Sequence, residues 1–283
     1  PTKADTDGDG PGDGDEIDAG TDPLDPTSTS SQPATNLNVG GVGKRAPRST
    51  LDANGMIHVI ATSSNNNGLF YYMIDQAGTV KIPETLLKLP VSSSAQVRRP
   101  IIRASGGKIF VTYELMDNNQ THSSIGFIRI NPAGAPQDGS PVLATQIVEV
   151  STTFTPTAGN PRHHDMQVSA SGIHLAYMQF ASARVRGGTN LGLRYSPLSV
   201  DGAVKSSLSL PLPNKLLGGM HKWTRPKLAI TADGTVHMLT LANVKKSATS
   251  ILWTVIGASG AKSYDIPLTA TLSSLAVAVQ GSL

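Results

Sequence analysis

A repeated layout of short apolar segments constrains the fold of this 283-residue chain more than any other feature. Each copy begins with a basic residue and a proline, then has an apolar stretch, a glycine turn and an apolar strand, and ends with a second strand and turn. The four copies run from Arg45 to Val80, Arg98 to Pro136, Asn160 to Val204 and Thr224 to Lys262. Repetition of one such unit predicts an architecture in which each unit buries its faces against its neighbours.

Each copy has room for four short β-strands. Apolar residues alternate at Ile57, Val59 and Ala61, which is the period of a half-buried strand. The tripeptides ANG, ADG and QAG are typical of hairpin turns, and no segment carries a capped apolar stripe of helical period. We therefore predict an all-β fold, a β-propeller whose blades span residues 45–97, 98–158, 159–223 and 224–270.

A fifth blade is expected to begin within residues 271–283. Ser274–Leu283 reads SLAVAVQGSL and matches KLAITADGTV at Lys227–Val236. In sequence pattern, the repeats over residues 45–283 resemble the sialidase-like or BNR-type repeats of bacterial secreted propellers. The sialidase Asp-box, Ser-x-Asp-x-Gly-x-Thr-Trp, is absent, and two Asp-Gly pairs retain only its turn.

The N-terminal residues Asp5–Glu16 read DTDGDGPGDGDE, which matches the spacing of a calcium-binding loop. Calcium takes about six to eight oxygen ligands, and a glycine at the sixth loop position permits the sharp turn. Gly10 occupies that position. We predict that this segment binds Ca²⁺ through the side chains of Asp5, Asp7, Asp9, Asp13 and Glu16 and the main-chain carbonyl of Pro11.

The residues after this loop argue against an EF-hand, because Ile17–Pro26 contains one glycine and two prolines where a helix would have to form. The string over residues 5–26, which ends in GTDPLDP, resembles the thrombospondin type 3 repeat of bacterial surface and secreted proteins. The resemblance implies a calcium-stiffened spacer over residues 1–27. Residues 28–44, rich in Ser, Thr and Asn, are expected to form a flexible linker.

Composition favours a protein that works outside the cell. The sequence contains no cysteine, so neither a disulfide nor a thiolate metal site can form. No apolar run approaches the roughly twenty residues needed to cross a bilayer. Together with the two resemblances, this predicts a secreted, extracellular or cell-surface bacterial protein without a transmembrane segment. No phosphate-binding loop or base-stacking pattern indicates a nucleotide or nucleic-acid partner.

Charge is divided unevenly along the chain. Residues 1–27 hold nine carboxylates against Lys3, whereas the remaining residues hold 22 Lys or Arg against 11 acids. One interpretation is that the basic body binds a polyanion such as an acidic polysaccharide. The other is that its dispersed basic residues serve solubility alone.

Two sets of residues recur at matching places in the repeats. His58, His174 and His237 follow the glycine turn in three copies, and Phe110 does so in the second. We interpret this as a packing position and not as a metal triad, because equivalent sites on separate blades need not converge on one ion. Four arginines near the repeat starts resemble the carboxylate-binding arginines of sialidases, and their recurrence also favours a scaffold role: Arg48, Arg99, Arg162 and Arg225.

The most enzyme-like cluster is Arg162, His163 and His164, followed by Asp165. It precedes a predicted inner strand and resembles propeller polysaccharide lyases, in which His and Arg near the axis abstract a proton and neutralise a carboxylate. The alternative is an ordinary polar loop. No acidic pair stands out for glycoside hydrolysis, although folding could bring Glu114 and Asp165 together.

The sequence thus favours a calcium-binding β-propeller that is not an enzyme but a binding or structural module in an extracellular assembly or on a glycan. Its partner is expected to be a glycan, a surface polymer or another protein subunit. The alternative is a propeller-type glycan-active enzyme, either a polysaccharide lyase or a glycosidase. In that case Arg162, His163 and His164 are the candidate catalytic residues.

Overall fold

The computed structural model describes residues 6, 8, 24, 44–63, 68–87, 89, 95–117, 119, 122–135, 142–155, 160–180, 190–210, 226–244 and 248–267. The chain divides into two units, Pro1–Val39 and Gly40–Leu283. All six predicted calcium ligands belong to the first unit and lie outside the described residues, as does the expected start of a fifth blade. All the helices and strands of the structure belong to the second unit within the described residues.

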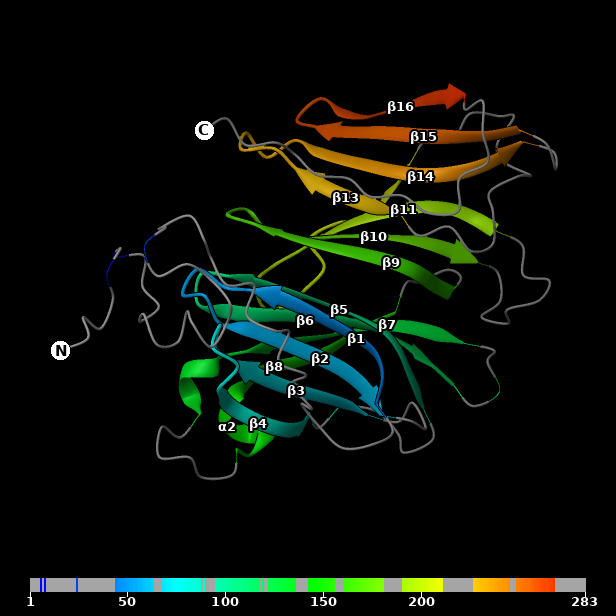
Figure 1. Ribbon diagram of the computed structural model, residues 1–283. Helices are drawn as coiled ribbons and strands as arrows, with labels where there is room; N and C mark the ends of the chain where they lie inside the picture. The colour runs from blue at the N-terminus through cyan, green and yellow to red at the C-terminus, as the bar shows by residue number, and fades with distance from the viewer. Residues whose placement is uncertain are drawn as a thin grey trace. The chain divides into compact units, whose positions relative to one another are not determined.

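The second unit consists of four four-stranded antiparallel sheets, and in each the strands pair in chain order (Figure 1). Blade 1 is β1 (Lys44–Leu51), β2 (Ile57–Ser63), β3 (Leu69–Ile74) and β4 (Val80–Leu87). Blade 2 is β5 (Gln96–Ser105), β6 (Lys108–Met116), β7 (Ser123–Ile130) and β8 (Val148–Phe154). Blade 3 is β9 (Asn160–Ser169), β10 (Gly172–Phe180), β11 (Asn190–Leu198) and β12 (Leu208–Ser209). Blade 4 is β13 (Lys227–Ile230), β14 (Val236–Val244), β15 (Ala248–Gly257) and β16 (Gly260–Pro267).

Helical structure in the described residues is limited to two short pieces between β7 and β8. These are the 3₁₀ turn η1 (Pro132–Gly134) and the single-turn helix α2 (Ala144–Ile147). No helix among the residues described here is long and apolar enough to cross a membrane.

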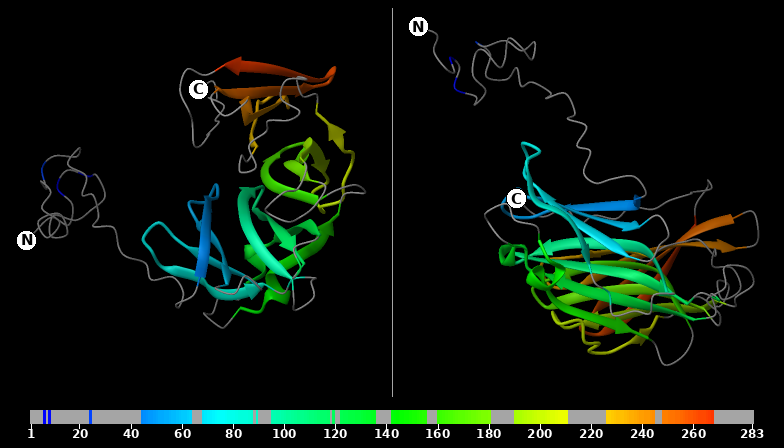
Figure 2. Two further views of the ribbon diagram at one scale, coloured as in Figure 1. Left: turned by 90° about the vertical axis from the view of Figure 1, so that its right-hand side faces the viewer. Right: turned by 90° about the horizontal axis from the view of Figure 1, so that it is seen from below.

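Successive blades pack face to face, and their first strands lie side by side. β1 contacts β5, β5 contacts β9, and β9 contacts β13. Figure 2 shows the four sheets in chain order, from blue to orange. Each pair of neighbouring blades encloses an apolar core: Ile60 and Val111 belong to the first, Phe127 and Leu175 to the second, and Met178 and Leu252 to the third. The predicted all-β, propeller-like fold with four blades is therefore confirmed.

The repeated histidine position packs within each blade against an aromatic ring of the next strand. The four ring pairs are His58–Tyr71, Phe110–Phe127, His174–Tyr195 and His237–Trp253, with centroids 6.1, 6.4, 6.0 and 5.9 Å apart. In two of them the ring nitrogen Nδ1 is also hydrogen-bonded to the tyrosine hydroxyl, at 2.7 Å for His58 and 2.6 Å for His174. These histidines therefore belong to the blade scaffold.

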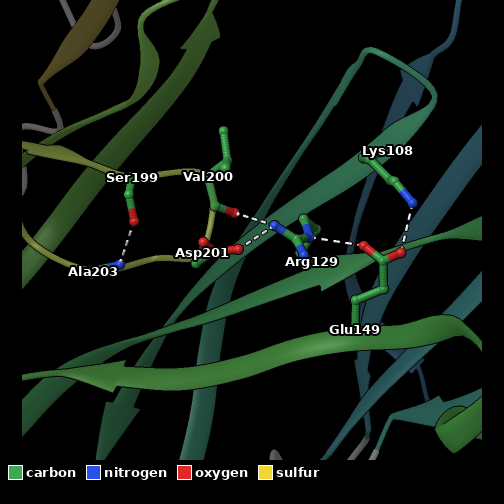
Figure 3. A network of polar contacts seen from close by, with 7 residues as sticks. All are labelled: Lys108, Arg129, Glu149, Ser199, Val200, Asp201 and Ala203. Carbon is green, nitrogen blue, oxygen red and sulfur yellow. Dashed lines mark hydrogen bonds and ion pairs between the residues drawn. The ribbon is translucent and has the colours of Figure 1, made fainter.

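A polar network joins the outer part of blade 2 to a turn of blade 3 (Figure 3). Arg129 of β7 ion-pairs with Glu149 of β8 at 2.8 Å and with Asp201 of the β11–β12 connection at 2.5 Å. Lys108 of β6 completes the network with a 2.6 Å contact to Glu149. Gly202, in the same turn, has φ +78°, and a Cβ added there would lie 2.8 Å from Cε1 of the Phe127 ring. The turn is thus closely docked on blade 2.

Candidate functional site

The first strands of blades 1, 2 and 3 share a β-bulge that contains one residue in the left-handed backbone region. The pairing of β1 with β2 shifts between Arg45 and Arg48, that of β5 with β6 between Arg98 and Ile101, and that of β9 with β10 between Arg162 and Asp165. The first residue inside each bulge has a positive φ: 50° for Ala46, 50° for Arg99 and 52° for His163. This conformation is costly for non-glycine residues, so tertiary contacts must hold it.

The bulges correct the sequence alignment of the repeats. They make Ala46, Arg99 and His163 equivalent, and they make Arg45, Arg98 and Arg162 the preceding residue. The second bulge residue is Pro47 in blade 1 and Pro100 in blade 2, but His164 in blade 3. Pro161 is thus not the counterpart of the other repeat prolines. Because Arg48, Arg99 and Arg162 occupy three different positions, their spacing no longer argues for a shared scaffold role.

Glu114 of β6 lies at the centre of a buried polar cluster where blades 2 and 3 meet. Its Oε2 accepts a 2.5 Å hydrogen bond from Nη1 of Arg99, and its Oε1 accepts a 2.6 Å bond from the main-chain N–H of His163. Oε1 also lies 3.7 Å from Nδ1 of His164. Glu114 is 1% exposed. One carboxylate therefore joins the two strained bulge residues of neighbouring blades.

The two histidines of the cluster are buried in strand β9, which corrects the alternative that they sit in a polar loop. Nε2 of His164 lies 3.0 Å from Oγ1 of Thr112, so this ring is held between Thr112 and Glu114. The His163 ring meets the edge of Phe180, with centroids 5.9 Å apart. Both histidines are less than 4% exposed. The structure therefore places both histidines in a buried strand and not in a loop.

Positive charge exceeds negative charge in this cluster. Burial lowers the pKa of the Arg162 guanidinium, and the charges of Arg99 and Arg98 lower it further, whereas the Glu114 carboxylate acts in the opposite sense. Burial by itself raises the pKa of Glu114, but the adjacent His164 ring and the charge of Arg99 hold it well below its ordinary value. Glu114 is therefore ionised at neutral pH. The Arg162 guanidinium thus interacts with two other guanidinium groups and with one carboxylate.

Asp165, the last residue of the predicted cluster, connects blade 3 to blades 2 and 4. Its Oδ2 accepts a 2.9 Å hydrogen bond from the main-chain N–H of Leu228 in β13, and its Oδ1 lies 3.6 Å from Nη2 of Arg103 in β5. Gln167 reinforces the connection, accepting from Arg103 at 3.1 Å and donating to the Leu228 carbonyl at 3.1 Å. Asp165 is therefore occupied in holding three blades together.

The other two arginines identified in the sequence are Arg48 and Arg225. The exposed Arg48 hydrogen-bonds to the neighbouring Pro47 carbonyl at 2.9 Å. Arg225 lies outside the described residues. Within the part of the chain that the structure describes, no group of three or more His, Cys, Asp or Glu side chains is placed to hold a metal ion. The candidate site is thus an Arg, His and Glu cluster.

Sequence reasoning missed the role of Glu114 and the equivalence of Arg99 with His163. Glu114 contacts a residue 49 positions away, and nothing in its local sequence marks that contact. A detectable signal did exist in the third repeat. Two repeats read Ala-Pro or Arg-Pro at the bulge, and the third reads His163-His164. A departure from the repeat pattern at a strained position indicates a local function.

Comparison with known proteins identifies the fold but no family. No protein-family model matches the sequence, and no curated protein matches it. A solved ulvan lyase of polysaccharide lyase family PL25, bound to -[GlcA(1-4)Rha3S]-, is similar at 14% identity and a TM-score of 0.52. The match covers 77% of this chain and 54% of the lyase, so the chain spans about half the length of that protein. The endo-arabinase from Bacteroides thetaiotaomicron VPI-5482 matches at 13% identity and a TM-score of 0.50, over 82% of this chain and 83% of that one.

These similarities correct the functional interpretation drawn from the sequence. At this level of identity the similarities show only a propeller-like fold. The matched propellers are themselves glycan-active enzymes. The expectation of a non-catalytic binding or structural module is therefore not supported by these matches, which agree better with its alternative.

Proposed function

We propose that the protein is a polysaccharide lyase that cleaves an acidic, uronate-containing glycan. The observation that carries the proposal is that the charges of Arg98, Arg99 and Glu114 all act on the buried Arg162 guanidinium, while Glu114 binds Arg99 and the main-chain N–H of His163. Excess guanidinium charge in a mostly buried setting favours an anionic ligand, and guanidinium groups match carboxylate geometry. The similarity in fold to an ulvan lyase supports the same class of reaction.

The cluster contains the groups that β-elimination requires. The Arg99 side chain is 21% exposed, so it can pair with a uronate carboxylate and stabilise the negative charge that develops when the neighbouring C–H proton is removed. The His163 imidazole is the candidate base for that proton. Loss of the proton from C5 to the imidazole forms a C4–C5 double bond and breaks the C4–O bond, and the departing glycosidic oxygen takes up a proton from solvent. His163 is 3% exposed, so the glycan must gain contact with the imidazole on binding.

The same cluster does not suit a glycosidase. Glycoside hydrolysis usually needs one protonated and one free carboxyl group flanking the scissile bond. Glu114 is ion-paired with its pKa lowered, so it is a poor proton donor. Both oxygens of Asp165 are occupied by Leu228 and Arg103. The described structure therefore favours the lyase over the glycosidase.

The remaining expectations from the sequence complete the proposal. We keep calcium as the ligand of the Asp5–Glu16 segment and a bacterial cell surface or the extracellular space as the location. Both rest on the thrombospondin type 3-like and BNR-like sequence patterns. Acidic polysaccharides are found in such settings, which agrees with a basic propeller body.

The test is a screen of polyuronates, among them pectate, alginate, hyaluronan and ulvan, for unsaturated products that absorb ultraviolet light. The wild-type protein should release them from at least one polymer. His163→Ala should lower kcat by about a hundredfold to ten-thousandfold, the usual loss of a general base. His122→Ala, at a histidine whose side chain is 85% exposed, is the matched control and should leave the rate unchanged. Cleavage that yields saturated products would indicate a glycosidase instead of a lyase. If no polymer is cleaved, the proposed function is wrong.

A further inference from the structure

Glu114 introduces a charge at a position where the equivalent residues are uncharged. The residue before each bulge pairs with Thr62 in blade 1, with Glu114 in blade 2 and with Met178 in blade 3. The blade fold therefore does not itself require a carboxylate at this place. Burying one is unfavourable unless charged partners and hydrogen bonds compensate for the lost solvation.

The partners of Glu114 come from two neighbouring blades. Arg99 on β5 and the His163 main-chain N–H on β9 each bind one carboxylate oxygen, and the His164 ring on β9 lies beside it. Hydrogen bonds to an ionised acceptor are shorter and stronger than neutral ones. The bond to the His163 N–H acts on the residue whose φ is 52°. The carboxylate thus stabilises a backbone conformation that is uncommon for residues other than glycine.

We propose that Glu114 is a positioning residue that fixes Arg99 and His163 relative to each other across the junction of blades 2 and 3. This inference rests on the proposed function, in which Arg99 binds the substrate carboxylate and His163 takes the proton. Glu114 itself contacts neither substrate nor reacting atoms. Its effect on the reaction comes from orientation, because a displacement of about 1 Å in a reacting pair can cost about a hundredfold in rate.

Glu114→Gln is the informative substitution, because the amide keeps the size of the side chain and loses the charge. We expect kcat to fall about a hundredfold with a much smaller change in KM. Glu114→Asp retains the charge on a shorter side chain and should recover part of the lost kcat. Glu149→Gln is the matched control, since Glu149 is also an ion-paired glutamate but lies in the Arg129 network. It should leave kcat unchanged.

A second measurement reports on position without relying on turnover. The protein has seven histidines, so labelling with ¹⁵N-histidine gives seven main-chain amide signals, and the one missing in His163→Gln identifies His163. In the wild type this proton should resonate downfield and exchange slowly with solvent, because it is bonded to a buried carboxylate. Glu114→Gln should move it upfield and speed its exchange, whereas Glu149→Gln should not.

The outcomes separate the two proposals. An unchanged His163 signal in Glu114→Gln, or a kcat equal to that of the wild type, overturns the positioning role. A lower melting temperature with full kcat in the folded fraction would show Glu114 to be structural only. If Glu114→Gln does not fold, Glu114→Asp, whose shorter side chain draws the carboxylate away from its partners, should still lower kcat and shift the His163 signal, and no change in either would overturn the positioning role. If the wild type cleaves no polyuronate, the proposed function fails, and the His163 signal still decides whether Glu114 holds the strained bulge.

Discussion

At the scale of single residues, burial determines how the scaffold histidines respond to pH. Burial lowers the pKa of His58, although its hydrogen bond and charge interaction with Asp52 oppose the effect. Burial also lowers the pKa of His174, and the charge of Lys205 adds to it. Both rings therefore take up a proton at a lower pH in the folded protein than in the unfolded chain, where the ordinary pKa is 6.5.

The first prediction concerns stability against pH. Because the folded pKa values are lowered, the unfolded state binds more protons below about pH 6.5, so the free energy of unfolding should fall as pH decreases from about 7.5 to about 5.5. The slope should reach at most about 1.4 kcal/mol per pH unit for each histidine. His58→Phe with His174→Phe, which reproduces the phenylalanine that blade 2 carries at Phe110, should flatten the slope in urea titrations. The exposed His122→Gln is the control, and a slope unaffected by the double variant would contradict this account.

Which site residues can be predicted from sequence depends on how far apart they lie in the chain. Arg162, His163 and His164 are consecutive, so their chemistry was visible as a cluster. Arg99 and Glu114 become their neighbours only through the packing of blade 2 on blade 3. Such contacts depend on side-chain geometry between sheets, which periodicity and turn signals do not encode.

At the scale of elements, two Asp-Gly turns offer a matched comparison. Gly202 and Gly234 have φ values of +78° and +85°, and their turns share the same main-chain hydrogen-bond pattern. A Cβ at Gly202 would press on the ring of Phe127 and lie 2.9 Å from Cγ2 of Thr152, whereas a Cβ at Gly234 meets nothing within 4 Å. One turn is docked on a neighbouring blade, and the other faces open space.

The second prediction follows from this difference. Gly234→Ala should lower the free energy of unfolding by about 1–2 kcal/mol, because the only cost is an alanine in the left-handed backbone region. Gly202→Ala should cost about 1–3 kcal/mol more, since overpacking against blade 2 adds to the same strain. Chemical denaturation of both variants measures the difference. Equal losses would mean that the turn of blade 3 is not firmly docked on blade 2.

The repeat pattern predicted the four blades, but it aligned the start of the third repeat incorrectly with the others. Hairpin turns and alternating apolar residues are local properties, so they placed the strands of each blade along the sequence. The bulges are not local: they exist because one strand has extra residues relative to its partner. Aligning the repeats on Pro161 shifted the third copy relative to its bulge and hid the substitution of His164 for proline.

At the scale of the whole molecule, the acidic N-terminal segment and the basic body should respond differently to calcium. The third prediction is that the Asp5–Glu16 loop binds calcium with a Kd of about 0.1 to 1 mM, the range of extracellular modules. Calorimetry on the full chain should detect this binding, and Asp7→Ala with Glu16→Ala should abolish it. Binding heat unchanged by the double substitution would refute the assignment.

Chelation provides a second measurement of the same property. Without calcium, the nine carboxylates of residues 1–27 repel one another, and the β-sheets keep their own apolar cores. A chelator should therefore increase protease cleavage before Lys44 and leave the sheets resistant. Unfolding of the sheets by chelator would instead place a calcium ion within the propeller.

The strained bulge residue gives this propeller a way to acquire new chemistry. Each of the first three blades has the same positive-φ bulge position. Its side chain is a methyl group at Ala46, a guanidinium at Arg99 and an imidazole at His163. Three different side chains at this bulge position are compatible with the same strand pairing. Functional groups can therefore be added or altered one blade at a time. Ala46 is the one of these three bulge residues that has no functional group, so substitution there is the way to add a further polar side chain to the propeller.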